Sequence, residues 1–416
     1  MAAPVVPPAR RPRNRKALIL AAASREFADR GYHAVGMEDI ALAVGISGPA
    51  LYRHFPSKYA LFAQCARSLA AELLDAWAPA PVGVDLADAD AARRHLDDVL
   101  ATLVRTTLRN RRTGRIYRWE GRYLESEDRA EVRALYDEMV GRVAGLVRAM
   151  RPEAGESDID LAATGALAVV ASLTAHHTSA PVRRTTTVIS DAAVRVALRP
   201  PPGDARADEP AAQGVRESIV SPPREPETRR DQVLDAAVRL FHSEGFAETT
   251  VEAIAVEAGL TPSGFYRHFT SKADVLLAAC LLASDHLDAT VAAAGVRGSP
   301  PSLALWRLTR AYVSHSFAHK EQMSVYSSDV ASLPAAGQAR LRALQREHVV
   351  LWSDLLVAAR PGVEAVEARF LVHAAIGTVT DLGRRVRWKN DDATQERVHD
   401  LVLGVLGVGG EPPRQN

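Results

Sequence analysis

The sequence predicts an all-α protein in which one helical unit of roughly 190–200 residues occurs twice. Apolar residues recur at helical spacing through most of the 416 residues, and no segment alternates convincingly like a strand. Residues 15–58 recur at 229–272 without a gap, at a constant offset of 214 residues. The repeat ends on "LYRHFPSK" in the first copy and on "FYRHFTSK" in the second.

Composition excludes several classes of protein. Hydrophobic residues make up 47% and charged residues 24%, and the net charge of +1 indicates no particular partner. Two cysteines are too few for a disulfide framework or a cysteine-rich metal site. We find no phosphate-binding glycine loop, HExxH or GxSxG motif, so we expect neither an enzyme nor a cofactor or metal. With no secretory signal or membrane-length apolar run, we expect a cytoplasmic protein that does not enter a membrane.

Each copy of the repeat predicts three short helices. In the first copy, residues 16–29 carry an apolar stripe that includes Ile19 and Phe27, and Gly31 follows where a helix ends. Residues 37–43 form the second helix. A turn at Gly45 then leads to a third helix capped by Ser47.

The second copy repeats this pattern with different caps. Thr249 and Glu252 predict a capping box for its second helix, whereas the first copy has Val35 there and Gly36 takes the role. Thr261 is the predicted cap of the third helix.

Long helices follow in both halves, with breaks near 78–90, 110–114, 151–158 and 178–181 in the first. A weaker similarity continues there at an offset of 208–209, which indicates that a whole subunit was duplicated. Residues 199–228 are rich in Pro, Gly and charge and predict a linker. The expected segments are a basic arm 1–14, DNA-binding domains 15–62 and 229–276, helical ligand and dimerisation domains 63–198 and 277–410, and the linker 199–228.

Three short helices with a tight glycine turn between the last two describe a helix-turn-helix. Small residues open the third helix (Ser47, Gly48, Pro49 and Ala50), so it suits close approach to base edges in a major groove. Donors at its far end suit phosphate oxygens.

The motif F-x-x-x-G-[YF], I-A, G-[IL]-[ST] and Y-R-H-F-x-[ST]-K, present in both copies, resembles the DNA-binding region of TetR/AcrR-family transcriptional regulators. The resemblance implies two tandem TetR-like units that bind double-stranded DNA, respond to a small-molecule effector and dimerise, usually as repressors. The arrangement resembles mycobacterial tandem-TetR repressors of lipid-transport operons, which suggests a lipid or acyl-CoA effector.

The resemblance also implies roles for individual positions. Tyr52, His54 and Lys58, with Tyr266, His268 and Lys272, resemble phosphate contacts, whereas Leu51, Phe55, Phe265 and Phe269 are expected in the core. The full DNA-contact set is Arg15, Ser47, Gly48, Pro49, Ala50, Tyr52, Arg53, His54, Lys58, Thr250, Thr261, Pro262, Ser263, Gly264, Tyr266, Arg267, His268 and Lys272.

The two copies differ in sequence and charge. The third helix starts with "SGPA" in the first copy and with "TPSG" in the second, so we expect the protein to bind two unlike half-sites. We also expect the two copies to form an intramolecular pseudo-dimer, and the chain could dimerise further. Residues 10–58 hold nine basic and four acidic residues, a net +5, whereas residues 224–272 hold six and eight, a net −2. The first copy should therefore supply most of the DNA affinity. We call the two expected DNA-binding domains, 15–62 and 229–276, the first and second heads. The alternative is a ligand-binding or interaction protein whose acidic second head no longer binds DNA.

Aromatic and histidine side chains in the later helices are the candidate ligand contacts, although most such residues are core. They are Trp119, Tyr123, His176, Trp306, Tyr312, His315, Trp352 and His373. Cys65 and Cys280 are expected to be small buried hydrophobes.

Overall fold

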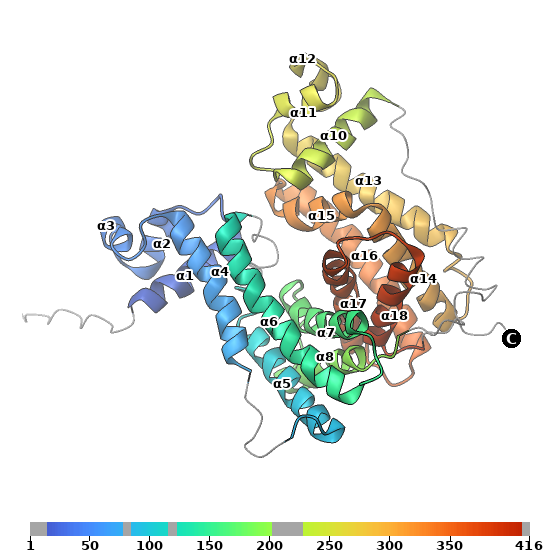
Figure 1. Cartoon of the computed structure of the whole chain (residues 1–416). Helices are drawn as coiled ribbons and strands as arrows, with labels where there is room; N and C mark the ends of the chain where they lie inside the picture. Colours follow the sequence, from blue (N-terminus) through green and yellow to red (C-terminus); the bar gives the residue numbers. More distant parts are fainter. Residues whose placement is uncertain (1–14, 78–84, 115–122, 202–227, 410–416) are drawn as a thin grey trace, which may run out of the picture. The chain divides into compact units, whose positions relative to one another are not determined.

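The computed structural model describes residues 15–77, 85–114, 123–201 and 228–409, and every regular element in these ranges is a helix, as the sequence predicts. The chain forms two compact units (Figure 1). The first unit runs to Leu74 and adds Asn110–Tyr136, and the second takes Asp75–Arg109 and the chain from Asp137 onward. The predicted segment boundaries stay predictions.

The first unit holds the first head. Its helices are α1 (Arg15–Arg30), α2 (Met37–Val44), α3 (Gly48–Tyr52) and α4 (Lys58–Asp75). Gly31 and Gly45 both have a left-handed φ, of 81° and 72°, as the ends of α1 and α2 require. Gly36 is the N-cap of α2 as expected, and its N–H donates to the Asp39 carboxylate at 2.8 Å. Phe27, Leu51 and Phe62 are fully buried at the centre of this head.

The second head lies in the second unit and repeats these helices as α10 (Arg229–Ser243), α11 (Val251–Glu257), α12 (Pro262–Phe265) and α13 (Lys272–Ala293). The predicted cap of α11 is wrong by one residue. Thr250 is the N-cap, and its hydroxyl accepts from the Ala253 N–H at 3.1 Å. Thr249 is instead buried, and its hydroxyl donates to the Gly245 carbonyl.

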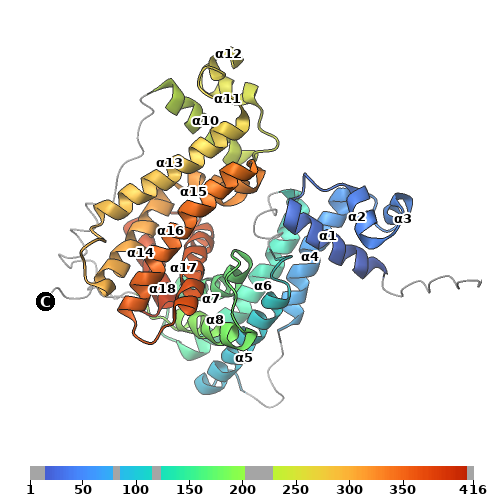
Figure 2. The ribbon, with the colours of Figure 1, turned by 180° about the vertical axis from the view of Figure 1, so that it is seen from behind.

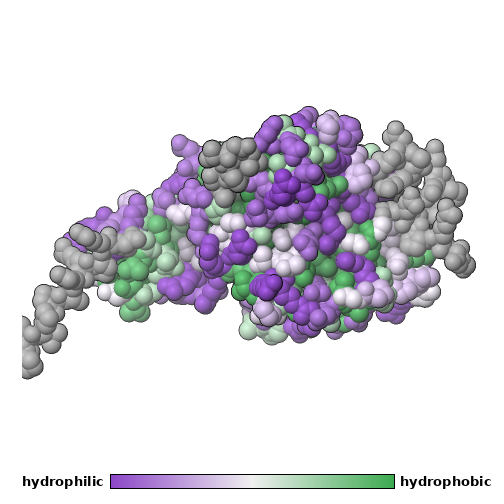
Figure 3. Space-filling view, turned by 90° about the horizontal axis from the view of Figure 1, so that it is seen from below, coloured by the Kyte–Doolittle hydropathy of each residue, from purple (hydrophilic) through white to green (hydrophobic). Residues whose placement is uncertain are grey.

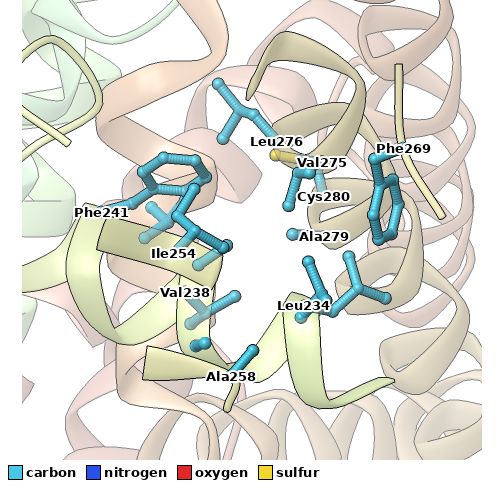
Figure 4. Close-up of a cluster of buried hydrophobic side chains, with 14 of the residues drawn as sticks. Leu234, Val238, Phe241, Ile254, Ala258, Phe269, Val275, Leu276, Ala279 and Cys280 are labelled. Atoms are coloured by element: carbon cyan, nitrogen blue, oxygen red, sulfur yellow. The ribbon is translucent and has the colours of Figure 1, made fainter. Parts of the chain in front are cut away.

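A compact apolar core holds the second head together (Figure 4). Phe241 and Ile254 point toward Val275 and Leu276 of α13 in the close-up, with Phe269 at the opposite side. Cys280 belongs to this core and Cys65 to the core of the first head. Both are free and buried, and burial raises the pKa of each thiol to about 12. This is the small-hydrophobe environment that the sequence predicts.

Four of the later helices of each repeat correspond, and one short helix of the second repeat falls opposite residues 111–120, of which only 111–114 are described. The later helices are α5 (Ala89–Arg109), α6 (Ser126–Met150), α7 (Glu156–Ala171) and α8 (Val182–Ala197) in the first repeat, and α14 (Pro301–Ala318), α15 (Lys320–Asp329), α16 (Ala335–Ala359), α17 (Ala365–Arg385) and α18 (Asp392–Leu406) in the second. Helix α16 begins 209 residues after α6, and α17 begins 209 after α7. These positions confirm the weak sequence alignment at an offset near 209.

The last two helices of each repeat pack together inside the second unit. Helices α7 and α8 contact each other, and α17 and α18 contact both of them (Figures 1 and 2). Gly165 of α7 allows close approach, because a Cβ there would lie 2.8 Å from a Val196 methyl of α8 and 3.8 Å from Leu382 of α17. A four-helix layer therefore joins residues from both repeats.

Two described helical segments are long and apolar enough to cross a membrane by length and composition alone. The first, Glu156–Thr174, is 72% buried inside the four-helix layer, as a core helix would be, and the second is α13, at 28%. Hydrophilic residues cover most of the face drawn in Figure 3, with smaller groups of apolar residues among them.

Candidate nucleic-acid interface

The third helix of the first head is anchored by two apolar side chains. Leu51 is fully buried and Phe55 is 4% exposed, so they fix α3 and the turn after it against the core. Because of this anchoring, Tyr52, Arg53 and His54 face solvent together. The Ser47 N-cap is also exposed, and its side chain makes no capping hydrogen bond among the described residues, so its hydroxyl is available to another partner.

The second head presents the same surface with different chemistry at the helix start. Phe265 and Phe269 are the buried anchors, and Tyr266 is 56% exposed against 52% for Tyr52. The Thr261 hydroxyl accepts from the Gly264 N–H at 3.2 Å and lies 3.0 Å from the Ser263 hydroxyl. This cap is part of the helix start, so α12 is more firmly capped than α3.

The two lysines predicted to contact phosphate are engaged within the protein. Lys58 Nζ donates to the Tyr32 carbonyl at 3.1 Å and lies over the Tyr32 ring. Lys272 Nζ donates to the carbonyls of Phe246 and Thr249 at 2.6 and 2.7 Å, and to that of Ala247 at 3.2 Å. Desolvation lowers the pKa of both ammonium groups. Each lysine ties the start of its long helix to the loop before the second helix, and a phosphate contact stays a prediction.

The predicted DNA-contact residues lie on or beside the third helix of their head, except for four. Lys58 and Lys272 begin α4 and α13. Arg15 is half-buried at the start of α1, and Thr250 caps α11. The exposed members are Ser47, Pro49, Tyr52, Arg53, His54, Thr250, Thr261, Pro262, Ser263, Tyr266 and Arg267. The half-buried members are Arg15, Gly48, Ala50, Lys58, Gly264, His268 and Lys272. Residues 1–14 of the predicted basic arm lie outside the described residues.

Acidic side chains of both heads are held by arginines. In the first head Arg30 pairs with Glu26 and Asp39, at 3.2 and 3.3 Å, and Arg112 pairs with Asp29 at 2.7 Å. In the second head Arg239 pairs with Glu257 at 2.9 Å. These pairs neutralise charge locally but leave the difference in net charge between the heads unchanged.

These two surfaces have counterparts among known proteins. Residues 19–65 and 233–279 both match the family described as bacterial regulatory proteins, tetR family. The chain therefore carries a TetR-family domain twice. The two matched segments begin 214 residues apart, at the offset of the internal repeat, so each head is a TetR DNA-binding domain.

The similarity to individual TetR proteins covers a short part of the chain. The transcriptional activator FasR of Mycolicibacterium smegmatis is 54% identical over 48 residues, which are 12% of this chain and 22% of FasR. The transcriptional repressor KstR2 of the same species is 42% identical over 50 residues, 12% of this chain and 24% of KstR2. The chain thus spans less than a quarter of the length of these relatives. The solved structure of the ketosteroid regulator KstR2 of Mycobacterium tuberculosis is 24% identical with a TM-score of 0.38, covering 44% of this chain and 95% of that one.

The residues predicted to bind a ligand fall into separate places. Trp119 lies outside the described residues. Tyr123 stacks on Tyr32 with ring centroids 5.8 Å apart, as part of the packing of the first TetR domain. His176 and His373 stack on each other with centroids 4.1 Å apart, joining the two repeats. Trp306 is buried against His399.

Only Tyr312, His315 and Trp352 come together in one place, between α14 and α16. Three further histidines that the sequence analysis passed over complete this group: His286 of α13, His319 at the end of α14 and His348 of α16. The spacing of four residues between His315 and His319, and between His348 and Trp352, is the signal that could have found them.

Proposed function

We propose that the protein is a ligand-responsive transcriptional repressor whose two repeats form an intramolecular pseudo-dimer on DNA. TetR-family regulators bind operator DNA, and this chain carries two TetR domains. Its place of action is the cytoplasm, where bacterial DNA lies. The effector is a small molecule of the lipid or acyl-CoA class, as the sequence resemblance suggests.

The observation that carries the pseudo-dimer is contact between residues at equivalent positions of the two repeats. Arg195 Nε donates to the Gly404 carbonyl at 3.3 Å, and Arg199 Nη1 donates to the Val408 carbonyl at 3.0 Å. Each pair is separated by 209 residues, the offset between the repeats. In a twofold interface, a position near the axis meets its own copy. These contacts therefore support a pseudo-twofold axis passing between α8 and α18.

Ion pairs on both sides of this axis add specificity to the packing. Arg199 makes a two-bond pair with Asp400 at 2.9 and 3.0 Å, and the Asp400 side chain is 6% exposed. Arg385 of α17 pairs with Asp160 of α7 and with Asp137, and Arg184 of α8 with Glu367 of α17. Residues of the first repeat are matched by charge to residues of the second, as an evolved interface requires.

Two unlike half-sites follow from the unlike helix starts. Gly48-Pro49-Ala50 presents little beyond backbone and a methyl group, whereas Pro262-Ser263-Gly264 adds a hydroxyl. Base edges in the major groove are distinguished by donors, acceptors and methyl groups, so these surfaces favour different bases. A symmetric operator would satisfy only one head.

Footprinting on the intergenic DNA upstream of the gene, with native mass measurement of the complex, tests this proposal. We expect an asymmetric footprint occupied by one chain. A variant with Pro262→Gly, Ser263→Pro and Gly264→Ala should prefer a palindrome of the first half-site, and the reciprocal exchange in the first head is the matched control. A symmetric footprint with two chains of the unaltered protein would contradict the pseudo-dimer.

A further inference from the structure

Three imidazoles lie close together in the second repeat, where His315 is buried and His286 and His319 are half-buried. The His315 and His319 ring centroids lie 4.7 Å apart, and those of His286 and His319 lie 5.7 Å apart. They come from α13 and α14, which pack against each other and against α15 and α16 (Figure 2). We call His286, His315 and His319 the histidine cluster.

Three buried polar atoms of this region make no hydrogen bond to any described residue. His315 is 2% exposed, and its Nε2 has no partner. The buried Nδ1 of His286 and Oε1 of Gln322, less than one turn beyond His319, also have none. Buried polar atoms are normally paired, because leaving one unpaired costs about 1–3 kcal/mol. The two unpaired histidine atoms belong to rings that both lie beside His319, and they indicate a site adapted to a ligand.

The hydrogen bonds around His315 fix what kind of group its Nε2 needs. The Thr290 hydroxyl donates its hydrogen to the His286 carbonyl at 2.8 Å and lies 3.5 Å from His315 Nδ1. Since that hydrogen is used, the hydroxyl is left to accept, and this contact favours the tautomer with the proton on His315 Nδ1. In a neutral ring the other nitrogen then has a lone pair. The Nε2 of His315 is therefore an acceptor that needs a donor, and Gln322 Oε1 is another.

The surroundings disfavour a charged ligand. Burial and the neighbouring histidines lower the pKa of His315 to about 3, and burial lowers that of His319. Burial also raises the pKa of Asp235, which lies within electrostatic reach of His286. Moving a charged group from water to a buried site costs free energy, so a bound ion is disfavoured beside the buried His315. An ammonium group and a carboxylate are both disfavoured, the carboxylate also because it offers no donor.

Aromatic side chains supply an apolar wall beside the cluster. Trp352 is fully buried, and its ring lies edge-on to Tyr312 at 5.8 Å. Trp352 Nε1 donates to His348 Nε2 at 2.9 Å, so the indole donor is already used and the wall presents carbon atoms.

The described residues of the first repeat hold no such cluster. Helices α5 and α14 end 209 residues apart, and at this offset Tyr312, His315 and His319 fall opposite Leu103, Thr106 and Asn110. His348 and Trp352 fall opposite Met139 and Val143, which are both buried. The two interiors are thus built for different purposes.

We propose that the histidine cluster is the effector site, that it exists only in the second repeat, and that it takes a neutral, mainly apolar molecule through a hydroxyl group donating to His315 Nε2. This inference rests on the proposed function, because it assigns the effector of that regulator. It narrows the effector from lipids in general to an apolar alcohol.

A matched series of probes tests it: 1-decanol, decylamine and decanoate, each titrated into the full chain with tryptophan fluorescence as the readout. We expect decanol to bind at least tenfold more tightly than decanoate or decylamine at pH 7.5, since only decanol offers a neutral donor. His315→Phe should weaken decanol binding about tenfold, and His315→Gln, which keeps an acceptor, should weaken it less. The exposed His242→Phe is the control and should bind as the unaltered protein does.

Four outcomes would overturn the inference: no decanol binding, preference for decanoate or decylamine, stoichiometric uptake of Zn²⁺ by the cluster in place of the alcohol, or equal binding by His315→Phe. Binding to the upstream DNA is measured on the same samples without any probe, and it also shows whether each variant folds. If the unaltered protein does not bind the upstream DNA, the proposed function is refuted. If it binds this DNA but one of the four outcomes is observed, only the effector site is refuted.

Discussion

Replacing Arg199 with alanine should loosen the joint between the two repeats. The change removes two hydrogen bonds to the Asp400 carboxylate and one to the Val408 carbonyl. These bonds are shielded from water, because the Asp400 side chain is only 6% exposed. Removing one member of a buried pair costs about 3–5 kcal/mol, and the 16% exposure of Arg199 places this pair near the lower end. We therefore expect the free energy of unfolding to fall by about 3 kcal/mol.

Urea unfolding followed by tryptophan fluorescence and circular dichroism measures this loss. The double variant Arg199→Met with Asp400→Leu should recover most of it, because an apolar pair of similar volume avoids the cost of an unpaired charge. The exposed pair Arg148–Glu156 is the control, and Arg148→Ala should change stability little. A loss below about 1 kcal/mol for Arg199→Ala would refute the reasoning, since it would mean that water screens the pair as it does at the surface.

Three further predictions concern the heads and the interior. Arg53→Ala should weaken DNA binding in a gel-shift titration more than Arg267→Ala, because the first head is more basic, and equal losses would contradict this. Between pH 7 and 5 the free energy of unfolding should fall, because histidines bind protons in the unfolded chain but stay neutral when they are buried in the folded protein. His315 and His348, whose pKa values burial lowers to about 3 and about 4, each contribute about 2 kcal/mol by pH 5. Finally, Lys272→Met should lower the Tm of the second head, and an unchanged Tm would show that its three carbonyl contacts are dispensable.

The sequence predicted the heads well because their determinants are local. Glycine positions, capping residues and apolar spacing fix the three short helices, and Gly36 could be recognised as a cap from its place alone. The same locality explains the error at Thr249. Two adjacent threonines satisfy the same capping pattern, and only burial of the first shows that the second is the cap.

The interior could not be predicted in the same way. The histidine cluster brings together residues of α13 and α14. Trp352 contacts His348 one turn away on its own helix, and it also contacts Tyr312, which lies on α14. Such groups depend on which faces of separate helices meet, and helical spacing does not determine that. Candidate residues were therefore found singly, and Tyr123, for example, packs within the first head rather than with the others.

The joint formed by α7, α8, α17 and α18 lies within one chain, and this has a consequence for the cell. Two separate subunits dissociate when they are diluted, whereas tethered partners meet at a fixed effective concentration, in the millimolar range for short flexible linkers. The association should therefore survive at a few copies per cell. Exchange of one half with another protein is also disfavoured, because the complementary half belongs to the same chain and is always nearest.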